Sequence, residues 1–138
     1  MPLALAAELD DINQRFQTAL HSLESALRSD TPDLLDIGKR RIALARAASA
    51  RLRFIDTKLC PALVAGPTPA HASAAQDLRT RISALFAASN RHIGEWSSQR
   101  VAADWAGYRD ATRAMAAAAK ALLAIDRREI YPLLLAAA

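Results

Sequence analysis

Apolar residues recur every three or four positions through four long stretches of this chain, and short breaks separate the stretches. Such spacing gathers the apolar side chains on one face of an α-helix. No stretch alternates apolar and polar residues over the length of a β-strand. The breaks are rich in Ser, Pro and Gly, which interrupt helices. We therefore predict four helices, over residues 3–28, 32–64, 70–98 and 104–131.

Two of the breaks carry residues suited to begin a helix. Thr31 precedes Pro32, so we expect Thr31 to be the N-cap of the second helix, with proline at the first helical position. Asp104 is the expected N-cap of the fourth helix.

The length and composition favour a single helical domain. The chain has 138 residues, and much of its apolar content is Ala, the strongest helix former. Short connections between long helices make neighbouring helices antiparallel. We predict an all-α fold, one domain over residues 1–138, arranged as an up-down-up-down antiparallel four-helix bundle.

The expected core follows the apolar face of each helix. Asp126 is the exception, because the pattern places this carboxylate on the inner face of the fourth helix. The residues expected to be buried are Leu5, Leu9, Ile12, Phe16, Leu20, Leu23 and Leu27, then Leu34, Ile37, Ile42, Ala45, Ala48, Leu52, Ile55 and Leu59, then Ala75, Leu78, Ile82, Leu85, Phe86, Ile93 and Trp96, and finally Trp105, Tyr108, Thr112, Met115, Ala119 and Leu122.

The charge and the single cysteine restrict the choice of partners and compartment. The net charge of +4 is spread over all four predicted helices, so a weak nucleic-acid-binding module is only a second alternative. Cys60 has no second cysteine with which to form a disulfide, which fits a cytoplasmic location, and its place near a helix end favours a packed, inert thiol over a redox sensor. We expect neither a signal peptide nor a membrane-spanning segment.

No arrangement of residues indicates catalysis. The chain has no glycine-rich phosphate loop, no paired inward carboxylates and no nucleophile with a plausible base beside it. We predict that the protein is not an enzyme.

Two helix endings resemble one another and a known family. The segments FIDTKLCPAL (residues 54–63) and LLAIDRREIYPLL (residues 122–134) both place Ile-Asp shortly before a proline. They resemble the ends of the second and last helices of hemerythrin-like (HHE cation-binding) domains. The resemblance extends to helix order, helix length and the position of the linker.

The resemblance implies a fold that holds two iron ions, but the ligand positions differ. In the family a His stands ten residues before the terminal proline of these helices and a carboxylate six before it. The corresponding residues, with two looser placements near the starts of the first and third helices, are Arg51, Ile55, Leu122, Asp126, Leu9 and Arg79. Only Asp126 can ligate a metal, so we expect no cofactor; the alternative is iron on non-standard ligands.

The same positions suggest two further hypotheses. Arg51, Arg79 and Asp126 could meet as a buried ion cluster in place of the metal. Alternatively, a relocated metal site could use His71 with Asp77 or Asp126. For His71 we favour an exposed histidine in a first helical turn, and for His92 with Glu95 a solvated pair.

The resemblance and the missing ligands together predict the function. We expect a non-catalytic hemerythrin-like bundle that has lost the di-iron site and acts through contacts with an unknown protein partner or by self-association, in a regulatory role. The first alternative is a metal protein that senses oxygen, nitric oxide or redox state. The apolar tail from Tyr131 is a candidate contact surface, unless it packs on the end of the bundle.

Overall fold

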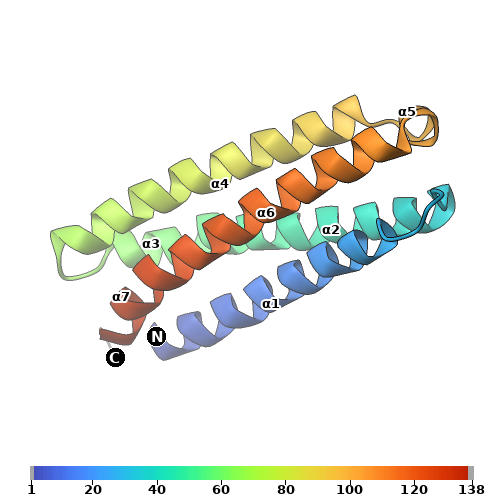
Figure 1. The fold of residues 1–138 in the computed structure, drawn as a ribbon. Helices are drawn as coiled ribbons and strands as arrows, with labels where there is room; N and C mark the ends of the chain where they lie inside the picture. The colour runs from blue at the N-terminus through green and yellow to red at the C-terminus, as the bar shows by residue number, and fades with distance from the viewer. Residues whose placement is uncertain (1, 137–138) are drawn as a thin grey trace.

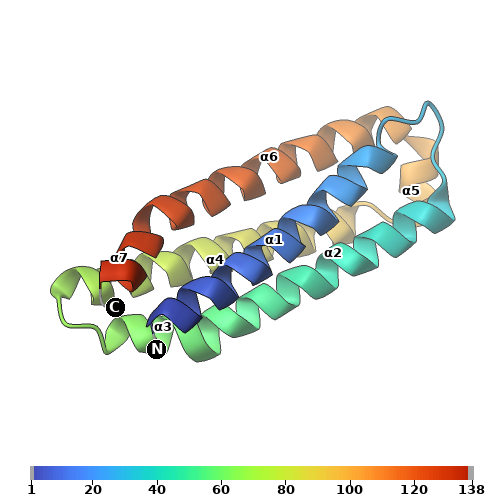
Figure 2. The same ribbon diagram turned by 90° about the horizontal axis from the view of Figure 1, so that it is seen from below.

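The computed structural model describes residues 2–136, and all its regular elements are helical; no strand occurs among these residues. Four long helices lie side by side, and both chain ends lie at the same end of the molecule (Figure 1, and from below in Figure 2). These helices are α1 (Pro2–Ala26), α2 (Leu34–Phe54), α4 (Pro69–Glu95) and α6 (Trp105–Glu129). α1 packs on α2 and α6, whereas α4 packs on α6 and on the short helix α3.

The predicted second helix is continuous but not regular. α2 leads directly into η1 (Ile55–Leu59), a π-helical turn, and then into α3 (Cys60–Val64). In the π turn the N–H of Cys60 donates to the carbonyl of Ile55, five residues earlier. Pro61 follows at once and has no N–H to offer the preceding turn. The wider turn therefore coincides with the place where the α-helical hydrogen-bond pattern has to be interrupted.

Two short helices were not predicted from the sequence. α5 (Ser98–Ala103) begins at Ser97, whose hydroxyl accepts a hydrogen bond of 3.2 Å from the N–H of Arg100. α7 (Tyr131–Ala136) turns back against α1 and α6 after the end of α6, and its Leu134 is buried. The tail thus packs partly on the molecule, while Leu135 remains exposed.

The helix caps test the two predicted N-caps separately. The Asp104 carboxylate accepts a hydrogen bond of 3.0 Å from the N–H of Gly107, so this prediction is confirmed. The prediction of Thr31 is wrong, because α2 begins later, with Asp33 as its N-cap. The Asp33 carboxylate accepts a hydrogen bond from the N–H of Asp36, and a carboxylate also complements the positive end of the helix dipole.

The core is closest to prediction on α1 and furthest from it on α2. Along α1 the predicted residues are buried or half-buried throughout. In the middle of the molecule, however, the fully buried cluster draws its members only from α1 and α6. That cluster consists of Phe16, Leu20, Ala116, Ala119 and Leu123.

Five residues predicted to be in the core lie at the surface: Leu34 and Ala45 of α2, and three large apolar residues of α2 and α4. Ile42 is 55% exposed, Phe86 46% and Ile93 48%. The reason is that α2 and α4 pack closely on other helices and not on each other. The small residues Ala45 and Ala48 of α2 face the gap and do not fill it. We call these exposed apolar residues of the two helices, Ile42 on α2 with Phe86 and Ile93 on α4, the α2–α4 face.

Among the described residues, no helix is both long enough and apolar enough to span a bilayer.

Candidate functional site

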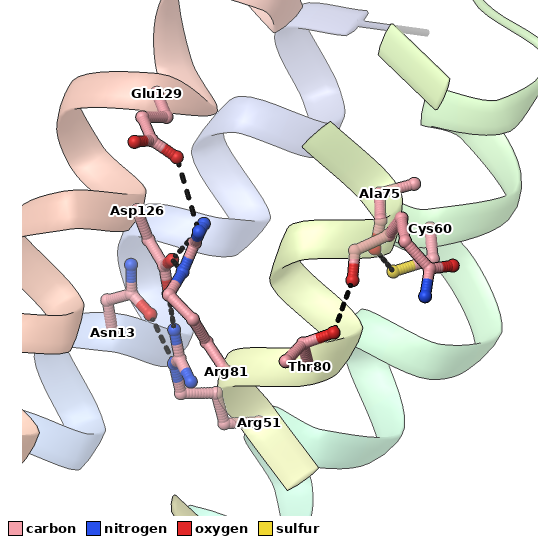
Figure 3. A network of polar contacts seen from close by, with 9 residues as sticks. Asn13, Arg51, Cys60, Ala75, Thr80, Arg81, Asp126 and Glu129 are labelled. Carbon is pink, nitrogen blue, oxygen red and sulfur yellow. Dashed lines mark hydrogen bonds and ion pairs between the residues drawn. The ribbon is translucent and has the colours of Figure 1, made fainter. Parts of the chain in front are cut away.

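Asp126 lies inside the molecule between two arginines. Its Oδ2 is 2.6 Å from Nη2 of Arg51, and its Oδ1 is 2.9 Å from Nε of Arg81 (Figure 3). Nη2 of Arg81 also lies 2.9 Å from Oδ1, but its direction does not suit a hydrogen bond, so that contact is electrostatic only. Both carboxylate oxygens of Asp126 are therefore engaged by guanidinium groups.

Two further side chains complete the arrangement. Nε of Arg51 donates to Oδ1 of Asn13 over 2.8 Å, and Nη1 of Arg81 lies 3.2 Å from the Glu129 carboxylate. The groups come from α1, α2, α4 and α6, so all four long helices meet here (Figure 3). We call Asn13, Arg51, Arg81, Asp126 and Glu129 the ion cluster.

The electrostatics of the ion cluster are those of a buried, balanced network. The side chains of Arg51 and Asp126 are each only 3% exposed. Burial lowers the pKa of Arg51, and the neighbouring Asp126 opposes this effect. A guanidinium nevertheless keeps its proton in proteins, so two positive charges face two carboxylates, Asp126 and the more exposed Glu129.

The structure brings together two of the three residues expected in a polar cluster. Arg51 and Asp126 meet, but Arg79 does not join them: it is exposed and lies near Cys60, whose pKa it lowers against the effect of burial. Arg81 stands in its place. Arg79 and Arg81 lie on opposite sides of the buried residues Leu78 and Ile82 of α4. Arg79 lies on the side of α3, and Arg81 lies on the side of α6.

Sequence reasoning missed Asn13, Arg81 and Glu129. A signal for Asn13 was present, because it lies four residues after Leu9 and three before Phe16, on the buried face of α1. Glu129 follows Asp126 by three residues, a spacing that brings side chains together on a helix.

The other residues that the resemblance placed at expected ligand positions cannot hold a metal. Leu9 and Ile55 are fully buried, and Leu122 is half-buried. Guanidinium groups repel cations, and the ion cluster leaves no carboxylate oxygen of Asp126 free. The side chains present at this place therefore do not fit iron.

The alternative ligands do not gather either. Nowhere in residues 2–136 do three His, Cys, Asp or Glu side chains come close enough to hold a metal ion. Asp77 is exposed. The expectation of an exposed His71 is wrong: it is 7% exposed, and its Nδ1 is 2.6 Å from the hydroxyl of Thr68. His71 is buried because it folds tightly against Gly66.

Cys60 is a buried thiol. Its Sγ donates weakly to the carbonyl of Ala75 at 3.8 Å (Figure 3), and burial raises its pKa. A raised pKa disfavours the reactive thiolate. Cys60 is therefore a packed side chain with a weakly reactive thiol.

A second feature lies between the helices, next to the ion cluster. Two adjoining cavities, of about 50 and 90 Å³, open between α2 and α4 beneath the α2–α4 face. They share part of their lining, and we call them together the central cavity. The shared lining residues are Phe16, Ala45, Ala48, Leu85, Ser89 and Ile93.

Comparisons with protein-family models, with curated proteins and with solved structures find no match to this chain.

Proposed function

We propose that this protein is a hemerythrin-like up-down-up-down four-helix bundle in which an ion cluster has replaced the di-iron site, and that it acts as a non-catalytic binding module for a protein partner. The order and length of the four long helices support the bundle. The engagement of both Asp126 oxygens by arginines supports the loss of the metal. The observation that carries the binding role is the α2–α4 face.

The α2–α4 face has the character of a docking surface for a helix. Ile42, Phe86 and Ile93 expose about half of their surface each, although large apolar side chains at this spacing ordinarily pack in a core. The small side chains of Ala45 and Ser49 on α2 line a groove together with Phe86 and Ile93 of α4. An amphipathic helix presents apolar side chains at matching intervals and fits such a groove.

The charges around the face favour an acidic partner over a second copy. Arg46 follows Ile42 by one helical turn, Arg53 follows the groove residue Ser49 by one turn, and Arg79 precedes Phe86 by two turns. All three are exposed, and none forms an ion pair with a residue that the structure describes. A symmetric dimer through this face would bring these arginines together, whereas glutamates flanking a partner helix would complement them.

A synthetic helix tests this function. We expect an 18-residue amphipathic peptide with a leucine stripe flanked by glutamates to bind, as measured by fluorescence anisotropy, and the same peptide with lysines to bind at least tenfold more weakly. Phe86→Ser with Ile93→Ser should abolish binding. Leu135→Ser, which alters an equally exposed apolar residue on α7, is the matched control and should leave it unchanged. Equal binding of both peptides, or equal loss in the control, would refute the proposal.

A metal analysis tests the other half of the proposal. Protein expressed in iron-supplemented medium and purified without chelator should contain no stoichiometric iron, and EDTA should leave its helical circular dichroism and melting temperature unchanged. Stoichiometric iron with a charge-transfer band would overturn the replacement of the metal by the ion cluster.

A further inference from the structure

The central cavity is apolar over most of its wall and polar at one end. All four long helices contribute to the wall, and its apolar side chains include Phe16, Leu20, Leu44 and Met115. At the α5 end of the same cavity stand Arg41, His92 and Tyr108. A cavity with an apolar body and a few convergent polar groups is the usual form of a small-molecule site.

Arg41 is a cation without a carboxylate partner. It is half-buried, and its Nη1 donates to the carbonyl of Trp96 over 2.8 Å. None of the ion pairs among the described residues includes it. At the other end of the cavity Arg51 also lines the wall, but Asp126 already neutralises it. Arg41 is thus the cation available to an anion in this cavity.

Tyr108 supplies a hydroxyl without a hydrogen-bond partner. The side chain is 0% exposed, and its Oη makes no hydrogen bond of ordinary geometry, although Thr112 is close enough to influence its pKa. Burial raises that pKa, so the group stays protonated and can donate. A buried hydroxyl left unpaired costs free energy, which a bound acceptor would recover.

The ring of Tyr108 is held firmly in place. His92 and Trp105 stack on it with centroid distances of 5.7 and 5.9 Å, Trp96 meets it edge-on at 5.5 Å, and the Arg41 guanidinium lies 5.8 Å from its centroid. The ring is thus packed on several sides, and the Arg41 guanidinium is held by the Trp96 carbonyl. Both side chains line the same end of the cavity, so a hydroxyl donor and a positive charge stand at one end of an apolar space.

We propose that the central cavity binds a small hydrophobic carboxylate, with its carboxylate at Arg41 and the Tyr108 hydroxyl and its apolar body between α2 and α4. The two adjoining cavities together approach the roughly 150 Å³ of an apolar cavity that holds benzene, which suits a body of about six to eight carbons. Either a short fatty acid or an arylalkanoic acid has this chemistry.

Calorimetric titration of the whole protein with octanoate and with 3-phenylpropanoate tests this site and separates the two sources. We expect at least one acid to bind and 1-octanol to bind at least tenfold more weakly, because it lacks the charge. Arg41→Gln should weaken binding of the acid about tenfold, and Tyr108→Phe should weaken it severalfold while preserving the ring. Arg113→Gln, at an exposed arginine of α6 that does not line the cavity, is the matched control and should leave acid binding unchanged.

A cavity-filling variant separates a binding site from a packing defect. Ala48→Leu should abolish binding of the acid, since Ala48 lines both parts of the cavity, and circular dichroism should show an intact fold. Absence of binding by both acids, or equal affinity for octanol and octanoate, would overturn the proposal. So would an unchanged affinity in Arg41→Gln.

This site does not depend on the helix-binding function. Phe86 and Ile93 also line the cavity, so the variant that separates the two sites is Arg41→Gln, which should weaken acid binding and leave peptide binding intact. Acid binding without peptide binding would therefore overturn the docking function alone, and the reverse result would overturn the carboxylate site alone.

Discussion

Arg51 and Asp126 are 75 residues apart in the chain, yet their side chains meet at 2.6 Å with almost no access to water. They join α2 to α6, and the other members of the ion cluster extend this link to α1 and α4. Taking two charges out of water is costly, and their attraction and hydrogen bonds must offset that cost. The pair therefore makes stability depend strongly on each partner being present.

Removing one partner should be severely destabilising. Asp126→Asn leaves the buried Arg51 without its counter-charge, so we expect a loss of about 3–5 kcal/mol in the free energy of unfolding. Urea denaturation followed by circular dichroism measures it. Asp77→Asn, which changes an exposed carboxylate, should stay within about 0.5 kcal/mol of the parent. An unchanged melting temperature for Asp126→Asn would show that the ion cluster contributes nothing to stability.

Replacing both partners by apolar residues should be far milder. In Arg51→Met with Asp126→Leu no unpaired charge remains at this contact, and Arg81 keeps Glu129 as its partner. We expect the double variant to recover most of the loss seen in Asp126→Asn, because buried ion pairs are often equalled by apolar packing. Urea denaturation of the two single variants and of the double variant tests this expectation. A loss of stability in the double variant equal to the sum of the two single losses would contradict it.

Two glycines should respond oppositely to alanine. A Cβ on Gly66 would lie 2.5 Å from ring atoms of His71, so Gly66→Ala should cost about 1–3 kcal/mol. A Cβ on Gly38 meets nothing within 4 Å, so Gly38→Ala should stabilise α2 by about 0.5–1 kcal/mol. Melting temperatures of the two variants measure the contrast. Stabilisation by both substitutions would argue against the tight fit of His71 at Gly66.

His92 should make the fold sensitive to mild acid. Burial and then the nearby Arg41 lower its pKa below 6.5, while Glu95 opposes them, and the ring also contacts Tyr108 and Thr112. Above about pH 6.5 the ring is neutral in the folded and in the unfolded protein, so it does not lower the free energy of unfolding. Below that value the unfolded chain takes up the proton more readily, so stability should fall until the pH reaches the lowered pKa of the folded protein.

Unfolding midpoints measured between about pH 5 and 8 test this dependence. His92→Gln should flatten the curve in the acidic half of that range. His21→Gln, at an exposed histidine of α1, serves as its control and should leave the slope unchanged. An identical slope in the parent and in His92→Gln would assign the acid sensitivity to other groups.

Helix periodicity predicted the helical class, and the resemblance of the two helix endings to a known family predicted that Arg51 and Asp126 would lie together. Arg51 and Asp126 were found because prolines fix the counting near both residues. No proline fixes the register near Arg79, and an error of two residues there moves a side chain from the α6 side of α4 to the α3 side. Periodicity also placed Ile42, Phe86 and Ile93 on inward faces. It describes a face of one helix and carries no information on how near the next helix lies.

The π turn in η1 allows one side of a long helix to carry a residue of the ion cluster and then a series of apolar core residues. Arg51, Ile55, Leu59 and Leu63 follow one another at intervals of four, and all are buried. In a regular α-helix each such interval overshoots a full turn by about 40°, so four residues in this series would spiral away from their neighbours. The wider turn makes one circuit last longer and brings them back into line. The π turn thus corrects the rotation of the helix, and it keeps the buried cation Arg51 and the apolar residues that follow it on one side.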